Sequence, residues 1–478
     1  MYLGVKKLAI MILVFAFYLV ASVQAGNNFF EGLSANGVLL DGENDTIGLK
    51  NPMLCLPKDV GINFVTLGQI DAIVNAGIKA RAFPGCQVLV LKEGKPVYDK
   101  CFGNFTYDAI QKVMPTTMYD LASLSKTTGT LLAVMKLYDS GQLKLTDKAS
   151  TYLTFLQGTD KANITIKELL FHESGLPAYI PFYRLVVEKN SKTIVLAGIK
   201  KTETTAMTNK NRIIGTDLQY KEGWVSGILS PEYLSQVSDS IFVSNRFHDA
   251  AMLSIASTKL NSKTYCYSCL NFMVLKEIVE TISRTSMDVF LDREFYRPMK
   301  LNNMAYLPLR THKREEVAPT LKIDLIRKVE IQGYVHDMDA ALLGGVSGNA
   351  GLFASAGDVA AVYQMLLNKG EKDGIRYLSA ETCNLFTTST SASGRRGLGF
   401  DKPFPGKSNH NPCSISTPRV VYGHTGYTGT CCWVDPLNSL VYVFLSNRTF
   451  PYDGLNKLAK TGIRTKIQDV IYQSMKKQ

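Results

Sequence analysis

Apolar and polar positions follow two different periods along this chain, one typical of helices and one typical of strands. Apolar residues recur with helical spacing at 70–78, and a second helix is predicted from about 123 to 141. Between these helices, two β-rich runs, 86–91 and 97–102, flank the turn-forming pair Glu93-Gly94. This pattern predicts a β-hairpin.

Strand patterns return near the carboxyl end. The runs 419–422, 431–435 and 440–445 are β-rich, and the turn-forming residues 436–439 join the last two into a second hairpin. A closing helix is predicted at 463–471, where apolar residues recur every three or four positions. Both ends of the chain therefore combine strands with a helix.

The middle of the chain is mostly helical and rich in loops. Apolar spacing predicts a helix at 274–282. Ser355 and Asp358 resemble a capping box ahead of another helix, which ends at 368–370. Periodicity is weaker at 178–262, which we interpret as an insertion.

We therefore expect an α+β fold. Both chain ends build one antiparallel sheet flanked by helices, and a helical region, about 125–395, is inserted between them. A doubly wound parallel sheet would need strands and helices to alternate throughout, and here they do not. The expected domain is 61–478, preceded by an extended N-terminal segment, 26–60, rich in glycine, asparagine and aspartate.

Residues 1–25 have the pattern of a signal peptide. Lys6 and Lys7 precede an apolar run at 8–20, and Val23-Gln24-Ala25 fits a cleavage site before Gly26. The run is short for a membrane span, which needs about 20 residues. We expect the mature protein to be exported, either periplasmic or secreted. An uncleaved anchor is the alternative.

The chain carries a formal net charge of +12, from 53 basic and 41 acidic side chains. This excess is spread along the sequence without a block of like charges, so we expect no nucleic-acid partner. A solvated basic surface explains the charge, and a mild attraction to anionic envelope surfaces is the alternative. We also expect no membrane span after removal of the signal, because no later stretch is long and apolar enough.

Nine cysteines leave at least one that is unpaired or paired outside the chain. Cys266 and Cys269 form a C-x-x-C motif, but no second such motif and no paired histidines accompany it. We therefore expect thiols that pack as small hydrophobic groups, and neither a metal nor another cofactor. A zinc site is the alternative interpretation of the motif.

Ser123 and Lys126 form a Ser-x-x-Lys motif. On a helix this spacing places both side chains on one face, so that the ammonium can approach the hydroxyl. A neutral lysine, or a tyrosinate held by a protonated lysine, can then accept the serine proton. The motif alone is weak evidence, because Ser474 and Lys477 repeat it in the C-terminal tail without functional meaning.

Two further motifs follow in order, Tyr267-Ser268-Cys269 before a predicted helix and His424-Thr425-Gly426 at the end of a predicted strand. With Ser-x-x-Lys, they resemble the motifs of the serine β-lactamase and penicillin-binding-protein superfamily, especially its class C, DD-peptidase and esterase-like branch. Other segments that look like landmarks of the superfamily are 83–86, 172–177, 348–353 and 423–448. The resemblance covers roughly 57–475, apart from the insertion.

The resemblance implies a role for each motif. Ser123 would be the acylated nucleophile, Lys126 its proton acceptor or electrostatic partner, and Tyr267 a proton shuttle to the leaving group. His424-Thr425-Gly426 would line the substrate cleft. The backbone amides of Ser123 and Tyr427 would form the oxyanion hole, which stabilises the charge that develops during attack.

Two positions depart from the pattern of the superfamily. Cys269 occupies a substrate-binding position where asparagine or aspartate is usual, and a thiol poorly replaces a carboxamide that binds the lysine and the substrate amide. Efficient β-lactam hydrolysis is therefore not expected. His424 replaces the commoner lysine, and imidazole is only partly charged near neutral pH. Weaker recognition of a free carboxylate would favour esters or atypical peptides.

The leading hypothesis is an exported serine hydrolase that forms an acyl-serine intermediate. Its partners would be small-molecule or peptide substrates: peptides with D-amino acids, including peptidoglycan fragments, β-lactams or esters. The alternative is a catalytically inactive relative that binds cell-wall peptides or a partner. An α/β-hydrolase is not indicated, because the chain has no Gly-x-Ser-x-Gly elbow. Acylation of Ser123 distinguishes the first two hypotheses, which share one fold.

Overall fold

The structure is a computed structural model that describes residues 57–188, 219–324, 326–404, 411–454 and 456–475. It also describes the backbone of two paired strands, Thr205–Met207 (β4) and Ile213–Gly215 (β5). The expected signal peptide, 1–25, and the expected extension up to residue 56 lie outside the described residues. The end of that extension, Pro57–Val60, forms a short 3-10 turn, and Val60 packs into a hydrophobic core.

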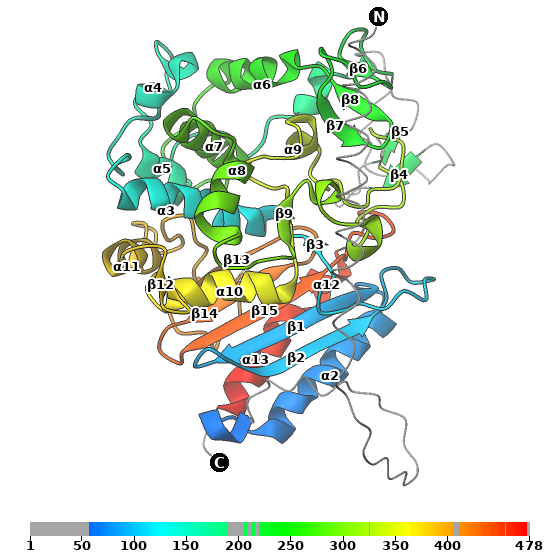
Figure 1. The fold of residues 1–478 in the computed structure, drawn as a ribbon, viewed down its shortest axis with the longest axis vertical. Helices are drawn as coiled ribbons and strands as arrows, with labels where there is room; N and C mark the ends of the chain where they lie inside the picture. Colours follow the sequence, from blue (N-terminus) through cyan, green and yellow to red (C-terminus); the bar gives the residue numbers. More distant parts are fainter. Residues whose placement is uncertain are drawn as a thin grey trace, which may run out of the picture. The chain divides into compact units, whose positions relative to one another are not determined.

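A five-stranded antiparallel sheet combines strands from both ends of the chain, as the sequence predicts (Figure 1). Its order is β13-β14-β15-β1-β2, so that β1 pairs with β2 on one side and with β15 on the other. The strands are Gly85–Lys92 (β1), Lys95–Gly103 (β2), Tyr422–Thr425 (β13), Cys431–Asp435 (β14) and Leu440–Ser446 (β15). Both predicted hairpins are present. The strand predicted at 419–422 instead begins at Tyr422, because Pro418 and Val421 close a turn.

The sheet is apolar on both faces, because alternate residues of its central strands point to opposite sides. In β15, Val441, Val443 and Leu445 belong to one hydrophobic cluster, and Leu440, Tyr442 and Phe444 belong to another. A sheet of this kind needs a cover on each face. The helices predicted at the two ends of the chain supply one of these covers.

The helices Phe64–Lys79 (α2) and Ile463–Ser474 (α13) pack on each other and share one cluster with the sheet. Close packing depends on Gly77 of α2, where a Cβ atom would lie 2.6 Å from the Ile463 side chain. The opposite face is covered by Ala356–Leu367 (α10), which contacts β1, β14 and β15. The sheet is therefore the middle of three layers (Figure 1).

The predicted capping box of α10 is only half correct. The Ser355 hydroxyl accepts a hydrogen bond from the Asp358 amide at 3.3 Å, as expected for an N-cap. The Asp358 carboxylate does not reach back to Ser355. It accepts from the amide of Asn303 at 2.6 Å and so fixes a neighbouring loop to the start of the helix.

The helical region lies beyond α10, on the side away from α2 and α13 (Figure 1). Its principal helices are Leu131–Asp139 (α3), Ala149–Tyr152 (α4), Ile166–Phe171 (α5), Arg246–Ser257 (α6), Cys269–Ser283 (α7), Met287–Leu291 (α8), Met338–Leu342 (α9) and Ala380–Thr388 (α11). A further short helix, Lys457–Thr461 (α12), precedes α13. The α3 helix contacts α7, α8 and α11 and is the centre of this region.

The middle of the chain also contains short strands that the sequence did not predict. They are Tyr119–Asp120 (β3), Val225–Ser226 (β6), Ser235–Ser238 (β7), Ile241–Val243 (β8), Met304–Tyr306 (β9), Leu352–Ala354 (β10), Glu371–Lys372 (β11) and Ile375–Arg376 (β12). Segments of two to four residues are too short to show a period of two. Part of the expected insertion, 178–262, packs into the main core, since Phe247, Ala251 and Ile255 of α6 are buried there.

Among the helices of the described residues, none combines the length and apolarity that spanning a bilayer requires.

Candidate active site

Ser123 lies in a short 3-10 turn, Ala122–Leu124, between β3 and the helical region. The chain continues as a π-helical turn, Lys126–Thr130, before α3 begins. The sequence predicted one regular helix from about 123. The observed segment instead begins with a 3-10 turn, which is tighter than an α-helix, and continues with a π-helical turn, which is wider. Single π turns occur frequently at functional sites.

The residue before Ser123 has a strained backbone. Ala122 has a φ of +47°, which is uncommon for a residue with a side chain. Its amide donates to Asp120 Oδ1 at 2.8 Å, and Asp120 Oδ2 accepts from the amide of His336 at 2.6 Å. Asp120 therefore holds the turn that carries Ser123 in place. Sequence reasoning missed this residue, because only its backbone partners reveal the role.

Lys126 is buried at the centre of the site. Its Nζ donates to Ser123 Oγ at 3.0 Å, to the carbonyl of Asn349 at 2.9 Å, and lies 3.7 Å from Cys269 Sγ. A lysine ammonium has three donors, and these three acceptors come from three separate segments. The Ser-x-x-Lys contact expected from the sequence is thus present.

Lys126 is protonated at neutral pH. Burial lowers the pKa of the ammonium, but the groups that face it, Asp337 among them, raise it, and the net pKa lies above the usual value for lysine. A protonated lysine cannot accept the serine proton. Tyr267, which faces the same ammonium, is the other candidate acceptor, and its role stays a prediction.

Tyr267 precedes α7 and faces the same ammonium. Lys126 Nζ lies 5.3 Å from the centroid of its ring, and the rings of His172 and His424 lie 4.6 Å and 6.0 Å away. The three motifs of the sequence therefore meet at one place, although they are far apart in the chain.

Cys269 is the first residue of α7, and its thiol lies between Lys126 and Asn349. Burial raises the pKa of the thiol, and this effect exceeds the opposing effects of Lys126 and the Asn349 side chain. The thiol is therefore neutral at pH 7. It offers Lys126 only a weak sulfur acceptor, as we expect where a thiol stands in the place of a carboxamide.

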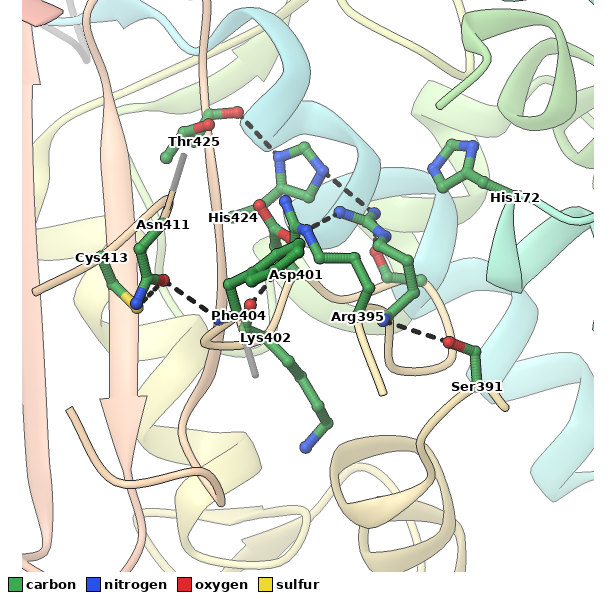
Figure 2. A network of polar contacts seen from close by, with 12 residues as sticks. His172, Ser391, Arg395, Asp401, Lys402, Phe404, Asn411, Cys413, His424 and Thr425 are labelled. Atoms are coloured by element: carbon green, nitrogen blue, oxygen red, sulfur yellow. Dashed lines mark hydrogen bonds and ion pairs between the residues drawn. The ribbon is translucent and has the colours of Figure 1, made fainter. Parts of the chain in front are cut away.

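His424 lies on β13 and is 2% exposed. Its Nδ1 lies 2.7 Å from the Thr425 carbonyl and its Nε2 lies 3.4 Å from Nη2 of Arg396 (Figure 2). The carbonyl requires a proton on Nδ1, so Nε2 is the acceptor. Burial, followed by Arg396 and Lys126, holds the pKa of His424 well below its usual value. The sequence suggested a partly charged imidazole. The buried ring is instead neutral.

Arg396 supplies a buried positive charge beside His424. Its Nη1 pairs with Asp401 Oδ1 at 3.0 Å. Arg395 pairs with the same carboxylate oxygen, and Figure 2 labels this second pair. Asp401 is held in place by two backbone hydrogen bonds to Gly423 of the neighbouring chain segment, at 2.8 and 3.1 Å. One carboxylate thus faces two guanidinium groups. Sequence reasoning missed Arg396, which belongs to no motif.

The loop 426–430 joins β13 to β14 and is hydrogen-bonded to the residues just before Ser123. Thr430 Oγ1 donates to the Leu121 carbonyl at 2.9 Å, and Thr428 Oγ1 donates to the Asp120 carbonyl at 2.6 Å. Gly426 permits this approach, because a Cβ atom there would lie 2.3 Å from the Leu121 carbonyl oxygen. The loop that carries Tyr427 therefore lies against the segment before Ser123. The oxyanion hole formed by their amides stays a prediction.

We expect replacement of His424 by asparagine to change how stability depends on pH. The folded pKa of His424 lies well below its usual value of 6.5, so below that pH the unfolded chain binds a proton that the folded chain does not. This histidine costs the wild type stability as the pH falls through about 6.5, by up to about 1.4 kcal/mol per pH unit, and has no such effect at higher pH.

Urea unfolding of both proteins between about pH 5 and pH 8 measures this effect. The free energy of unfolding of the wild type, minus that of His424→Asn, should decrease as the pH falls. Other titrating groups are present in both proteins and largely cancel. A difference that stays constant over the whole range contradicts a neutral, buried His424.

The sequence profile of the β-lactamase family matches residues 70–461. An Escherichia coli O157:H7 protein named "Putative D-alanyl-D-alanine carboxypeptidase" is 30% identical over 421 residues, covering 82% of this chain and 84% of that protein. The N-acetylmuramyl-L-alanine amidase of Bacillus subtilis (strain 168) is 27% identical over 462 residues, covering 91% and 90%. A solved class C β-lactamase has a TM-score of 0.57 at 16% identity, covering 85% of this chain and 98% of its own.

The family match spans most of the chain, and the solved structure shares the mixed fold with its antiparallel sheet. From these similarities we conclude that this chain belongs to the β-lactamase family of serine hydrolases.

Proposed function

We propose that this protein is an exported DD-carboxypeptidase, which removes the terminal D-alanine from peptides that end in D-alanyl-D-alanine. The observation that carries this proposal is the buried guanidinium of Arg396, which lies beside His424 and has its Cζ 5.6 Å from the centroid of the Tyr267 ring. A fixed positive charge beside His424 and Tyr267 suits a substrate with a free carboxylate. The Escherichia coli relative carries the name of this activity.

In the proposed acylation step, the Tyr267 phenolate, paired with the Lys126 ammonium, removes the proton from Ser123 Oγ. The oxygen attacks the carbonyl carbon of the penultimate D-alanine, and the backbone amides of Ser123 and Tyr427 stabilise the resulting oxyanion. Tyr267 then gives its proton to the leaving amine, and free D-alanine departs. Water subsequently hydrolyses the acyl ester and regenerates Ser123.

Arg396 would bind the terminal carboxylate of the substrate. Its guanidinium is 1% exposed as a side chain, and its Nε–H has no acceptor among the residues that the structure describes. Buried donors are normally satisfied, so an unpaired one beside His424 and Tyr267 fits a carboxylate oxygen of the substrate. Thr425, also at the end of β13, would supply a second contact. This arrangement replaces the charge that the usual lysine would provide at position 424.

Replacement of Arg396 by glutamine tests this role. For an acylated peptide ending in D-alanyl-D-alanine, we expect kcat/KM to fall about 10- to 100-fold, because a charge-assisted hydrogen bond contributes about 1.5–3 kcal/mol. For the same peptide with a C-terminal amide, the change should be less than about threefold. Arg395→Gln is the matched control, since Arg395 shares Asp401 but not the contact with His424. Equal losses on both substrates contradict carboxylate recognition.

A second candidate function is cleavage of the amide bond between N-acetylmuramic acid and L-alanine. The observation in its favour is the Bacillus subtilis amidase, which aligns with 91% of this chain. Mass spectrometry of a digested muramyl pentapeptide separates the two activities. Release of D-alanine supports the carboxypeptidase, whereas release of the intact peptide from the sugar supports the amidase.

Acylation of Ser123 tests catalysis itself. Intact-mass spectrometry after exposure to a fluorophosphonate, and separately to a penicillin, should show one adduct on the wild type and none on Ser123→Ala. A penicillin adduct favours D-alanyl-D-alanine substrates over simple esters. The intact mass also tests export. If the signal peptide is removed, the protein from the native cells should have the mass of a chain that begins at Gly26. Folded wild type that forms neither adduct supports an inactive binding protein instead.

Replacement of Cys269 by asparagine should raise activity towards penicillins. The carboxamide oxygen is a stronger acceptor for Lys126 than the neutral thiol, and its amino group can bind the substrate amide. We expect acylation by penicillin to accelerate about tenfold, the equivalent of one additional hydrogen bond. Stopped-flow kinetics measure the rate. Cys266→Asn is the control, because that thiol makes no described contact with Lys126. A slower or unchanged Cys269→Asn variant refutes this explanation of the substitution.

A further inference from the structure

His172 is the C-cap residue of α5 and begins the segment 172–177, which resembles a landmark of the superfamily. Its backbone is left-handed, with a φ of +57°, and the residue is 1% exposed. The imidazole ring lies against the Tyr267 ring, with centroids 4.6 Å apart and planes inclined by 35°. Figure 2 shows the ring close to the network around His424.

His172 is bonded to the residues on both sides of Tyr267. Its carbonyl accepts from the Cys266 amide at 2.9 Å, and its Nδ1 accepts from the Ser268 amide at 3.1 Å. One residue therefore holds the backbone before Tyr267, the backbone after it, and one face of its ring. The bond to Cys266 is made by the backbone of residue 172, whereas the bond to Ser268 needs an acceptor on its side chain.

Neighbouring groups fix the orientation of the imidazole. Asn271 Nδ2 lies 3.0 Å from Nδ1, and Asn271 Oδ1 accepts from the Ser174 hydroxyl at 2.6 Å. Because the hydroxyl occupies the amide oxygen, the Asn271 amino group must donate to Nδ1, which is thus an acceptor for two donors. The ring must then be neutral, with its proton on Nε2. The charged groups around it, Arg396 and Lys126, oppose a second proton, and burial opposes it most.

We propose that His172 is a positioning residue, which holds the Tyr267 phenol in place for proton transfer from Ser123 without touching the substrate. This inference rests on the proposed role of Tyr267. Its chemistry requires an aromatic ring to contact the phenol and an acceptor at the position of Nδ1. Histidine combines both in one side chain, whereas phenylalanine retains only the ring and asparagine retains only the acceptor.

The substitutions His172→Phe, His172→Asn and His172→Gln separate these requirements. Asparagine places its carbonyl oxygen near the position of Nδ1, whereas glutamine reaches the position of Nε2. We expect the acylation rate by fluorophosphonate to fall about 100-fold in His172→Phe, the effect of a displacement of about 1 Å. The acylation rate of His172→Asn should be at least about tenfold higher than that of His172→Phe, whereas the rate of His172→Gln should not be. The KM for a peptide ending in D-alanyl-D-alanine should change less than about threefold in all three.

A double-mutant cycle with Tyr267→Phe shows whether His172 acts through the tyrosine. If it does, His172→Phe has little further effect once the phenol hydroxyl is absent. Independent, multiplicative losses overturn the inference, and so does a wild-type acylation rate in His172→Phe. If His172→Phe does not fold, by circular dichroism and melting temperature, equal rates in the asparagine and glutamine variants overturn it.

The same cycle distinguishes a failure of the proposed role of Tyr267 from a failure of the inference about His172. If Tyr267→Phe acylates at the wild-type rate, the role of Tyr267 is wrong, and the positioning role falls with it. If Tyr267→Phe loses acylation while His172→Phe retains it, only the inference about His172 is wrong. The pH dependence of acylation adds an independent readout, because a displaced general base should alter the acidic limb of the profile, on which the base becomes protonated.

Discussion

The buried ammonium of Lys126 is the constraint on which the rest of the site depends. Removing a charged group from water costs several kcal/mol unless hydrogen bonds replace its hydration. Here three residues surround the ammonium. They are Ser123 in the turn 122–124, Asn349 in the loop before β10, and Cys269 at the start of α7. The lysine can be buried only if these three segments are correctly placed, so the site and the fold stabilise each other.

Buried polar side chains join the sheet to the helical region at this place. Gln87 of β1 donates to the carbonyl of Met114 at 2.7 Å and accepts from the amide of Ala356 at 2.8 Å. It thereby connects the sheet to the segment before β3 and to the start of α10. Thr428 and Thr430 make corresponding bonds to the residues before Ser123. Groups of this kind are costly when unpaired, and they therefore fix the position of Ser123 relative to the sheet.

Charge in the site is divided between groups that stay ionised and groups that stay neutral. Lys126 and Arg396 carry positive charge, whereas His424 and His172 are held neutral by burial and by those same cations. Each histidine is thereby limited to one tautomer, in which one ring nitrogen accepts a hydrogen bond. The site therefore presents two fixed positive charges beside two neutral imidazoles.

Local patterns in the sequence determined the elements with strong periodicity: both hairpins of the sheet, the helices α2, α7, α10 and α13, and the three motifs that meet at Lys126. These follow from neighbouring residues, because alternation, helical spacing and turn chemistry act over a few positions. Short strands such as β3 and β10 were missed, since their two or three residues are strands only through their partners.

Only the tertiary structure decided how the site is completed. Asp120 acts through the amide of His336, Arg396 lies 28 positions from His424, and His172 lies 96 positions from Ser268. None of these pairs leaves a periodic pattern, because their contacts depend on how separate elements pack. The ionisation states were equally hidden, since the pKa of a histidine or lysine is set by burial and by charges that folding brings near it.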